Sequence, residues 1–146
     1  MRSWPAAAPT SSSDVHRWFE HTSELELHID SPTLCGVFED ALGAFAELVA
    51  EGANPEQPFS LTFSLEARDP ATLLAEFLEE LIFLAETQGF VPERPQISVE
   101  AVGTKLTAIV QGTIGEPPHL VKAVTYHGLE LRREGDGFHA RAVLDV

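Results

Sequence analysis

The segment from residue 122 to the end of the chain constrains the fold most strongly, because it alternates on both sides of a glycine-rich turn. Before the turn one side of the pattern is made by Ala123, Thr125, His127, Leu129 and Leu131. After the turn the period of two that β-strands have groups Phe138, Ala140, Ala142, Leu144 and Val146. Gly135-Asp136-Gly137 tolerates the positive φ of a tight hairpin. The chain is therefore predicted to end in a β-hairpin.

Acidic groups gather at the tip of this last predicted strand. If Val146 is the natural end, Asp145 lies beside its α-carboxylate, and the two repel unless a cation or strong donors sit there. Glu24 begins the polar face of an earlier alternating segment, and antiparallel pairing of the two segments would let their ends meet. Carboxylates with water suit a hard cation, Ca²⁺, Mg²⁺ or Mn²⁺, rather than zinc. The alternative is that these strand-end carboxylates are simply solvated.

The rest of the chain divides into strands and two helices. Strands are predicted over 17–20, 24–30, 59–67, 97–101 and 106–110, with loops at 54–58, 92–95 and 112–119. Ser31-Pro32 and Asp69-Pro70 each join a capping side chain to a proline that suits a first helical turn. The helices that they open are predicted to end at Gly52 and Gly89. This order predicts an α+β domain of two layers, in which a mixed or antiparallel sheet carries both helices on one face.

Composition narrows the classes of function. The net charge of -14 argues against a nucleic-acid groove and against an anionic membrane surface, while it suits cation binding or docking to a basic partner. A single cysteine, Cys35, excludes an internal disulfide and a cysteine-based zinc site, and we expect it to be a small buried side chain. No apolar run approaches the roughly 20 residues of a membrane span.

The start of the chain differs from the remainder. Residues 1–16 are rich in Pro, Ser and Ala and lack the apolar region of a signal peptide. We therefore expect a disordered leader, followed by a single domain over residues 17–146. With one thiol and no export signal, the cytoplasm is the expected compartment.

No catalytic constellation is evident. The phosphate-binding loops, the nucleophile elbow of hydrolases and the paired histidines of zinc proteases are absent. Thr22 directly follows His21, and neighbouring strand residues point to opposite faces, which spoils a nucleophile–base pair. Thr125 and His127 lie two positions apart, on one side of their predicted strand. A hydrolase working through the paired acids would lack a nucleophile, and the chain is predicted not to be an enzyme.

Two motifs resemble the archease family. One is the segment Lys122-Ala-Val-Thr-Tyr-His127, followed by a short strand, a glycine turn and the terminal Leu144-Asp145-Val146. The other is His21-Thr22-Ser23-Glu24, at the place where archeases carry a His-Thr-Ala-Asp element. The helical pattern over residues 73–81 is also similar. The resemblance covers roughly Trp18 to Val146, so the predicted domain is archease-like.

The resemblance implies a non-catalytic accessory protein of RtcB-type RNA ligases, which join RNA ends in tRNA splicing and RNA repair. The family promotes guanylylation and multiple turnover of the ligase and can widen its nucleotide use. It implies a metal site at Glu24, Asp145 and Val146, with Ca²⁺ favoured over Mg²⁺ or Mn²⁺, and a partner or phosphate contact at Lys122. We expect a monomer or weak homo-oligomer that makes no direct contact with nucleic acid. The alternative is a cation- or small-ligand-binding module unrelated to RNA ligation.

This sequence departs from the family pattern in two places. Glu24 stands where the motif has Asp, and the extra methylene moves the carboxylate by more than about an ångström. The loop from Gly112 to Val121 is shorter than is typical of archeases. These two departures are compatible with a specialised or diverged member of the family.

Overall fold

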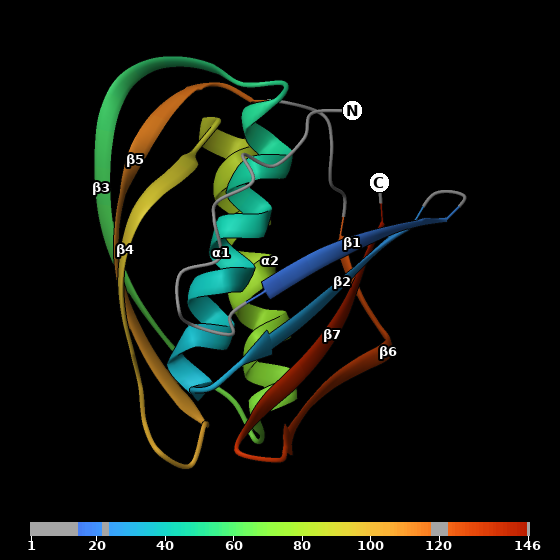
Figure 1. Ribbon diagram of the computed structural model, residues 1–146. Coiled ribbons are helices and arrows are strands. Elements are labelled where there is room, and N and C mark those ends of the chain that lie inside the picture. The colour runs from blue at the N-terminus through green and yellow to red at the C-terminus, as the bar shows by residue number, and fades with distance from the viewer. Residues whose placement is uncertain (1–14, 22–23, 118–122, 146) are drawn as a thin grey trace.

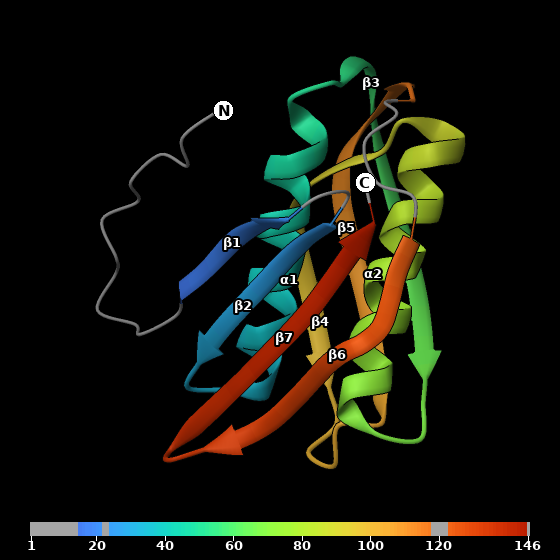
Figure 2. The ribbon, with the colours of Figure 1, turned by 90° about the vertical axis from the view of Figure 1, so that its right-hand side faces the viewer.

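The computed structural model describes residues 15–21, 24–117 and 123–145, and within these two helices lie between two antiparallel sheets (Figure 1). The elements are β1 (Val15–His21), β2 (Glu24–Ser31), α1 (Leu34–Ala50), β3 (Asn54–Glu66), α2 (Pro70–Gln88), β4 (Val91–Val99), β5 (Lys105–Glu116), β6 (Ala123–Glu134) and β7 (Gly137–Asp145). The four-stranded sheet has the order β1-β2-β7-β6 and the three-stranded sheet the order β3-β5-β4. Figure 2 looks onto the four-stranded sheet, with both helices behind it.

The predicted α+β class, with antiparallel strands and two helices, is confirmed. The described strands form two sheets where one was expected, so the helices make a middle layer. The reason lies in the width of their buried surfaces, because a helix that faces one sheet buries a single stripe. The buried residues of α1 and α2 cover more than one stripe: Gly36, Val37, Phe38, Ala41, Leu42, Ala44, Phe45 and Val49, and Leu73, Leu74, Ala75, Phe77, Leu78, Leu81, Ile82, Leu84 and Ala85.

Aromatic contacts join the layers. Phe38 of α1 meets Phe77 of α2 edge-on, with ring centroids 5.5 Å apart, and both side chains are fully buried. Phe63 of β3 lies 6.0 Å from Phe77, and Phe59 of the same strand lies 6.0 Å from Phe90. The three-stranded sheet is thereby packed onto the helix pair.

The predicted capping residues are confirmed at both ends of α2, whereas the predicted N-cap of α1 is wrong. The Asp69 carboxylate accepts a 2.7 Å hydrogen bond from the Thr72 N–H, and Gly89 ends α2 with a left-handed φ of 63°. The cap of α1 is Thr33, whose hydroxyl accepts from the Gly36 N–H at 3.0 Å. Ser31, the predicted cap, is instead the buried last residue of β2, and its hydroxyl accepts from the Thr33 N–H at 3.3 Å. Helix α1 ends at Ala50, just before the expected Gly52.

Proline-rich segments predicted as loops are parts of strands. Residues 54–58 begin β3 and residues 92–95 lie in β4, the two edges of the three-stranded sheet. Proline lacks an N–H for the ladder, so a sheet tolerates it at an edge or at a bulge. Both conditions are met, because the register shifts between Pro55 and Gln57 and between Pro92 and Arg94.

Two glycines let the central strand β5 continue between these bulged edges. A Cβ on Gly112 would overlap the Val91 carbonyl oxygen, and one on Gly115 would overlap the Asn54 carbonyl oxygen. The loop predicted to start at residue 112 therefore begins only after Glu116.

The terminal hairpin forms as predicted, with Glu134 opposite Gly137 and Gly135 at a φ of 60°. The alternation predicted through β6 is interrupted, because five residue steps from Thr125 to Glu130 face two steps of β7. Gly128, at a φ of 77°, lies within this bulge. Inward-facing residues consequently change from even to odd positions between Val124 and Leu129.

We expect Gly112→Ala to lower the free energy of unfolding by about 1–3 kcal/mol, because the added methyl group forces two backbones apart. Urea denaturation measures the change. Gly135→Asn is the control, since nothing lies within 4 Å of that position and Asn tolerates a positive φ. Equal stability of Gly112→Ala and the wild type would contradict the close approach.

We expect Asp69→Ala to cost about 1 kcal/mol at neutral pH, through loss of the cap on α2. The hydrogen bond from the Thr72 backbone N–H lowers the pKa of Asp69 below its ordinary value. This stabilisation is complete above the unfolded-state pKa, about 3.9, and is lost as the pH falls through the lower folded-state pKa. The stability gap between wild type and variant should thus narrow only in acid, and a gap that is constant from neutral pH to about pH 2 would contradict this assignment.

Candidate functional site

One end of the four-stranded sheet brings together the acids predicted from the sequence. Glu24, the first residue of β2, lies directly opposite Asp145, the last residue of β7. On the outer strands His21 lies opposite Glu24, and Ala123 lies opposite Asp145. The four strands thus place these backbone positions in one row across the sheet.

Glu24 and Asp145 both belong to the outer face of this sheet. The core contains Leu27 and Ile29 from β2 and Leu144 from β7, so the alternating positions face outward. Directly opposed residues of an antiparallel pair have Cβ atoms about 4.5–5.5 Å apart. Both acids are half-buried. The spacing is close enough for the two carboxylates either to repel one another or to share a cation.

The other two residues predicted for this site lie outside the described residues. Lys122 is the chain neighbour of Ala123, and Val146 is the chain neighbour of Asp145. Within the described part of the chain, no side-chain hydrogen bond or ion pair involves the Glu24 or Asp145 carboxylate.

The middle of the same outer face is held by its own charge pairs. Arg141 Nε donates to Glu26 Oε1 at 3.1 Å, and His28 Nε2 lies 3.1 Å from the same oxygen. Phe19 of β1 packs edge-on against the His28 ring, with centroids 4.8 Å apart. These contacts separate the Glu24–Asp145 end of the face from its opposite end.

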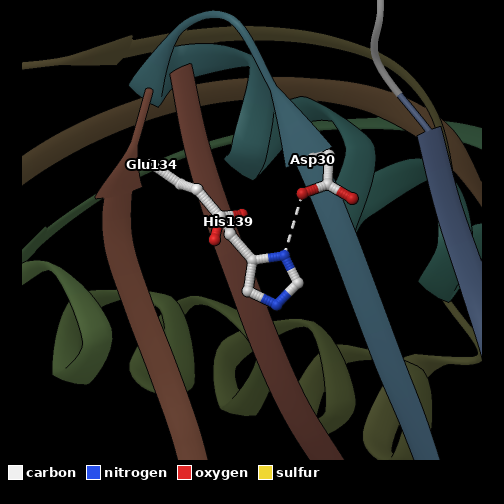
Figure 3. Close-up of side chains that lie close together, drawn as sticks. All are labelled: Asp30, Glu134 and His139. Carbon is white, nitrogen blue, oxygen red and sulfur yellow. Dashed lines mark hydrogen bonds and ion pairs between the residues drawn. The ribbon is translucent and has the colours of Figure 1, made fainter. Parts of the chain in front are cut away.

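The opposite end carries a cluster that sequence reasoning missed (Figure 3). His139 Nδ1 lies 2.8 Å from Asp30 Oδ1, and Glu134 approaches the same pair from β6. Asp30 and His139 are 109 positions apart in the sequence, so spacing alone could not associate them. The available signal was that each occupies the polar side of an alternating strand.

The described part of the Lys122–His127 motif, residues 123–127, begins β6 and enters its bulge. Tyr126 reaches from this bulge to α2, where its hydroxyl donates to Glu79 Oε1 at 3.3 Å. Partial burial, together with the neighbouring Glu79 carboxylate, raises the pKa of the Tyr126 hydroxyl. Tyr126 therefore links the motif to the helix layer.

Cys35 and Thr125 do not form nucleophile–base pairs. The Cys35 thiol donates to the Ile97 carbonyl oxygen at 3.1 Å, and burial followed by the charge of Glu39 raises its pKa. A raised pKa keeps the thiol protonated and less nucleophilic. The Thr125 hydroxyl donates to the backbone carbonyl of His127 rather than to its ring.

The helices of the described residues give no sign of a membrane span, since none is both long enough and apolar enough to cross a bilayer.

Several known proteins that are similar to this chain are named archease. The pattern of the Archease protein family matches residues 16–146. "Protein archease" from Pyrococcus furiosus is 28% identical over 144 residues, covering 90% of this chain and 100% of that protein. "Protein archease" from Thermococcus kodakarensis is 31% identical over 134 residues, covering 84% of this chain and 93% of that protein.

Solved structures agree with the sequence comparisons. The solution structure of protein 1598 from Methanobacterium thermoautotrophicum has a TM-score of 0.65 at 25% identity, and the match covers 90% of this chain and 98% of that one. An archease from Thermotoga maritima, described as a possible chaperone, has a TM-score of 0.64 at 20% identity with the same coverage. The latter likeness concerns the fold alone.

Proposed function

The chain belongs to the archease family, and from this membership we propose that it is a non-catalytic activator of an RtcB-type RNA ligase. In this role it promotes guanylylation of the ligase and its repeated turnover during tRNA splicing and RNA repair. The family match includes both the His21–Glu24 element and the Lys122–His127 motif. The description of the Thermotoga protein as a possible chaperone is compatible with an accessory role.

The observation that carries this function is the register that sets Glu24 opposite Asp145. The two acids come from distant parts of the chain, and each lies in one of the motifs shared with archeases. Their opposition supports an anionic site, because like charges directly opposite one another in a sheet are destabilising unless another group offsets them.

The donor set at this end fits a hard divalent cation. Glu24, Asp145 and the main chain of Val146 would offer only oxygen atoms, which is the ligand type that Ca²⁺ and Mg²⁺ prefer. Glu24 offers a longer side chain than the Asp of the family motif, and a glutamate that reaches across to the neighbouring strand can still meet Asp145. When bound, the ion supplies a positive centre that offsets the carboxylate repulsion. We propose Ca²⁺ as the favoured ion, with Mg²⁺ or Mn²⁺ as alternatives.

The negative net charge of the chain favours a protein as its partner rather than RNA. A chain of net charge -14 does not compete with a ligase for RNA, and it is attracted to a basic rim. Lys122 contributes a positive charge one position before Ala123 in the sequence, and we assign it a contact with the ligase or with a phosphate. We place this activity in the cytoplasm, where a lone thiol is stable.

We expect Ca²⁺ to bind the wild-type chain and, at about 100 times its Kd, to raise the free energy of unfolding by about 2.7 kcal/mol. Asp145→Asn and Glu24→Gln should each weaken binding at least tenfold, roughly the loss of a charged ligand. Glu24→Asp keeps the carboxylate and should keep binding. Calorimetric titration measures these affinities.

Glu66→Gln is the matched control for cation binding. It removes one exposed carboxylate from β3, on the other sheet, where Glu66 pairs only weakly with Lys105 at 3.4 Å. If Glu66→Gln and Asp145→Asn lower the Ca²⁺ affinity equally, the binding is unspecific attraction to an acidic protein and the assigned site is wrong.

We expect the wild-type chain to accelerate guanylylation when mixed with an RtcB-type ligase, GTP and metal, and to catalyse no RNA joining alone. Asp145→Ala should remove most of the acceleration, Lys122→Ala should reduce it, and Glu66→Gln should leave it unchanged. Incorporation of labelled guanylate into the ligase is the measurement. Full activation by a folded Asp145→Ala protein would refute the assigned role of this acid pair.

A further inference from the structure

The far end of the same outer face carries a cluster of different chemistry (Figure 3). Asp30 from β2, His139 from β7 and Glu134 from β6 each offer one ligand atom, and these atoms lie within 4.8 Å of one another. Three adjacent strands therefore converge on one point. We propose that Asp30, Glu134 and His139 form a second cation site, which binds a divalent transition-metal ion such as Zn²⁺.

The pairing of the strands brings these three side chains together. Asp30 and His139 are direct partners in the β2–β7 register, so their side chains leave the same face side by side. Arg132 of β6 lies opposite His139, and Glu134 follows two residues later on the same face. The tight turn after Glu134 holds β6 against β7 at this end.

One of the distances is already close to that between two bound ligands, whereas Glu134 is placed only within 4.8 Å of the other two ligand atoms and has to move toward an ion. His139 Nδ1 and Asp30 Oδ1 are 2.8 Å apart. Two ligands that each lie about 2.1 Å from one ion are separated by about 3.0–3.4 Å when the angle between them is 90–109°. An ion can thus replace the proton of the His139–Asp30 hydrogen bond if these two atoms move apart by a few tenths of an ångström. The His139 side chain is only 15% exposed, so its position is set by its neighbours before a metal arrives.

The imidazole distinguishes this cluster from a group of surface acids. Carboxylates alone favour Ca²⁺ or Mg²⁺, whereas a nitrogen ligand joined to two carboxylates favours Zn²⁺ and neighbouring transition metals. Glu24 and Asp30 are six positions apart on one strand, or about 20 Å. The two ends of the face are therefore separate sites. The Glu24–Asp145 end favours hard cations such as Ca²⁺, and the His139 end favours transition metals such as Zn²⁺.

Neighbouring arginines do not block the ligand atoms. Arg17 approaches Asp30 through Oδ2 at 3.6 Å, which leaves Oδ1 facing His139. Arg132 contacts Glu134 through Oε1 at 2.8 Å, and a carboxylate has a second oxygen to offer. Both pairs are exposed to solvent, where such contacts are weak.

A hollow of about 230 Å³ borders the cluster and is lined in part by Asp30, Glu134 and Asp136. It leaves room for water beside the two carboxylate ligands. Three protein ligands and a water complete the four-coordinate arrangement of zinc sites that keep one exchangeable position.

The test is a calorimetric titration of Zn²⁺ into the untagged, full-length chain. We expect one saturable site per chain, weakened at least tenfold by His139→Gln and by Glu134→Gln. Glu134 is half-exposed beside the hairpin turn, so its substitution leaves the core untouched if His139→Gln proves unstable. Asp145→Asn should keep Zn²⁺ binding while losing Ca²⁺ binding, which separates this site from that of the proposed function.

His28→Gln is the matched control. It removes an imidazole from the same face, with its ring 5.9 Å from that of His139, but its nitrogen contacts Glu26 instead of Asp30. Zinc affinity equal to wild type in His28→Gln and reduced in His139→Gln supports the site. The absence of a saturable Zn²⁺ event in the wild type, or equal losses in both histidine variants, would overturn it.

Discussion

Antiparallel pairing of β2 with β7 is the constraint on which the rest of the structure depends. It joins residues 24–31 to residues 138–145, which are distant in the chain, and it lies in the middle of the four-stranded sheet. A slip of one residue would exchange the two faces of a strand. Because Leu27, Ile29 and Leu144 are buried against the helices, such a slip would expose the core. Burial therefore sets the register, and the register sets what the outer face can bind.

A comparison of approximate free energies shows why Glu24 and Asp145 can stay opposite one another in spite of their like charges. Burying an aliphatic side chain of this size contributes about 1.5–3 kcal/mol, and the pairing buries several. Two carboxylates 4 Å apart repel by about 1 kcal/mol in water and about 4 kcal/mol near a protein surface. The buried core can thus hold Glu24 opposite Asp145 in the register against the repulsion between their carboxylates. A bound cation would cancel the repulsion between the two carboxylates. The register that the buried side chains fix is thereby linked to the proposed cation binding.

Much of this arrangement was predictable, because the local signals agreed with the fold. The terminal hairpin, the α2 caps at Asp69 and Gly89, and the polar side of β2 follow from patterns within a few residues. The meeting of Glu24 and Asp145 was predicted conditionally, from the hypothesis that their strands are neighbours.

The features that were predicted wrongly or missed share a physical cause, because each of them depends on contacts with residues far away in the sequence. Pro55 and Pro92 indicated loops, and only their edge positions beside glycine-bearing β5 allow strands. Ser31 has the chemistry of a cap but was drawn into the end of β2. The contact of His139 with Asp30 required the exact β2–β7 register, and the second sheet required knowledge of both helix faces.

The decisive experiment is a Ca²⁺ titration of the isotope-labelled chain, followed by backbone amide NMR. We expect cross-strand proton contacts between Glu24 and Asp145 without the ion, and the largest Ca²⁺-induced amide shifts at both residues together. Shifts at Asp30 and His139, at the far end of the same face, should be small. Missing cross-strand contacts, or shifts centred away from the Glu24–Asp145 row, would contradict it.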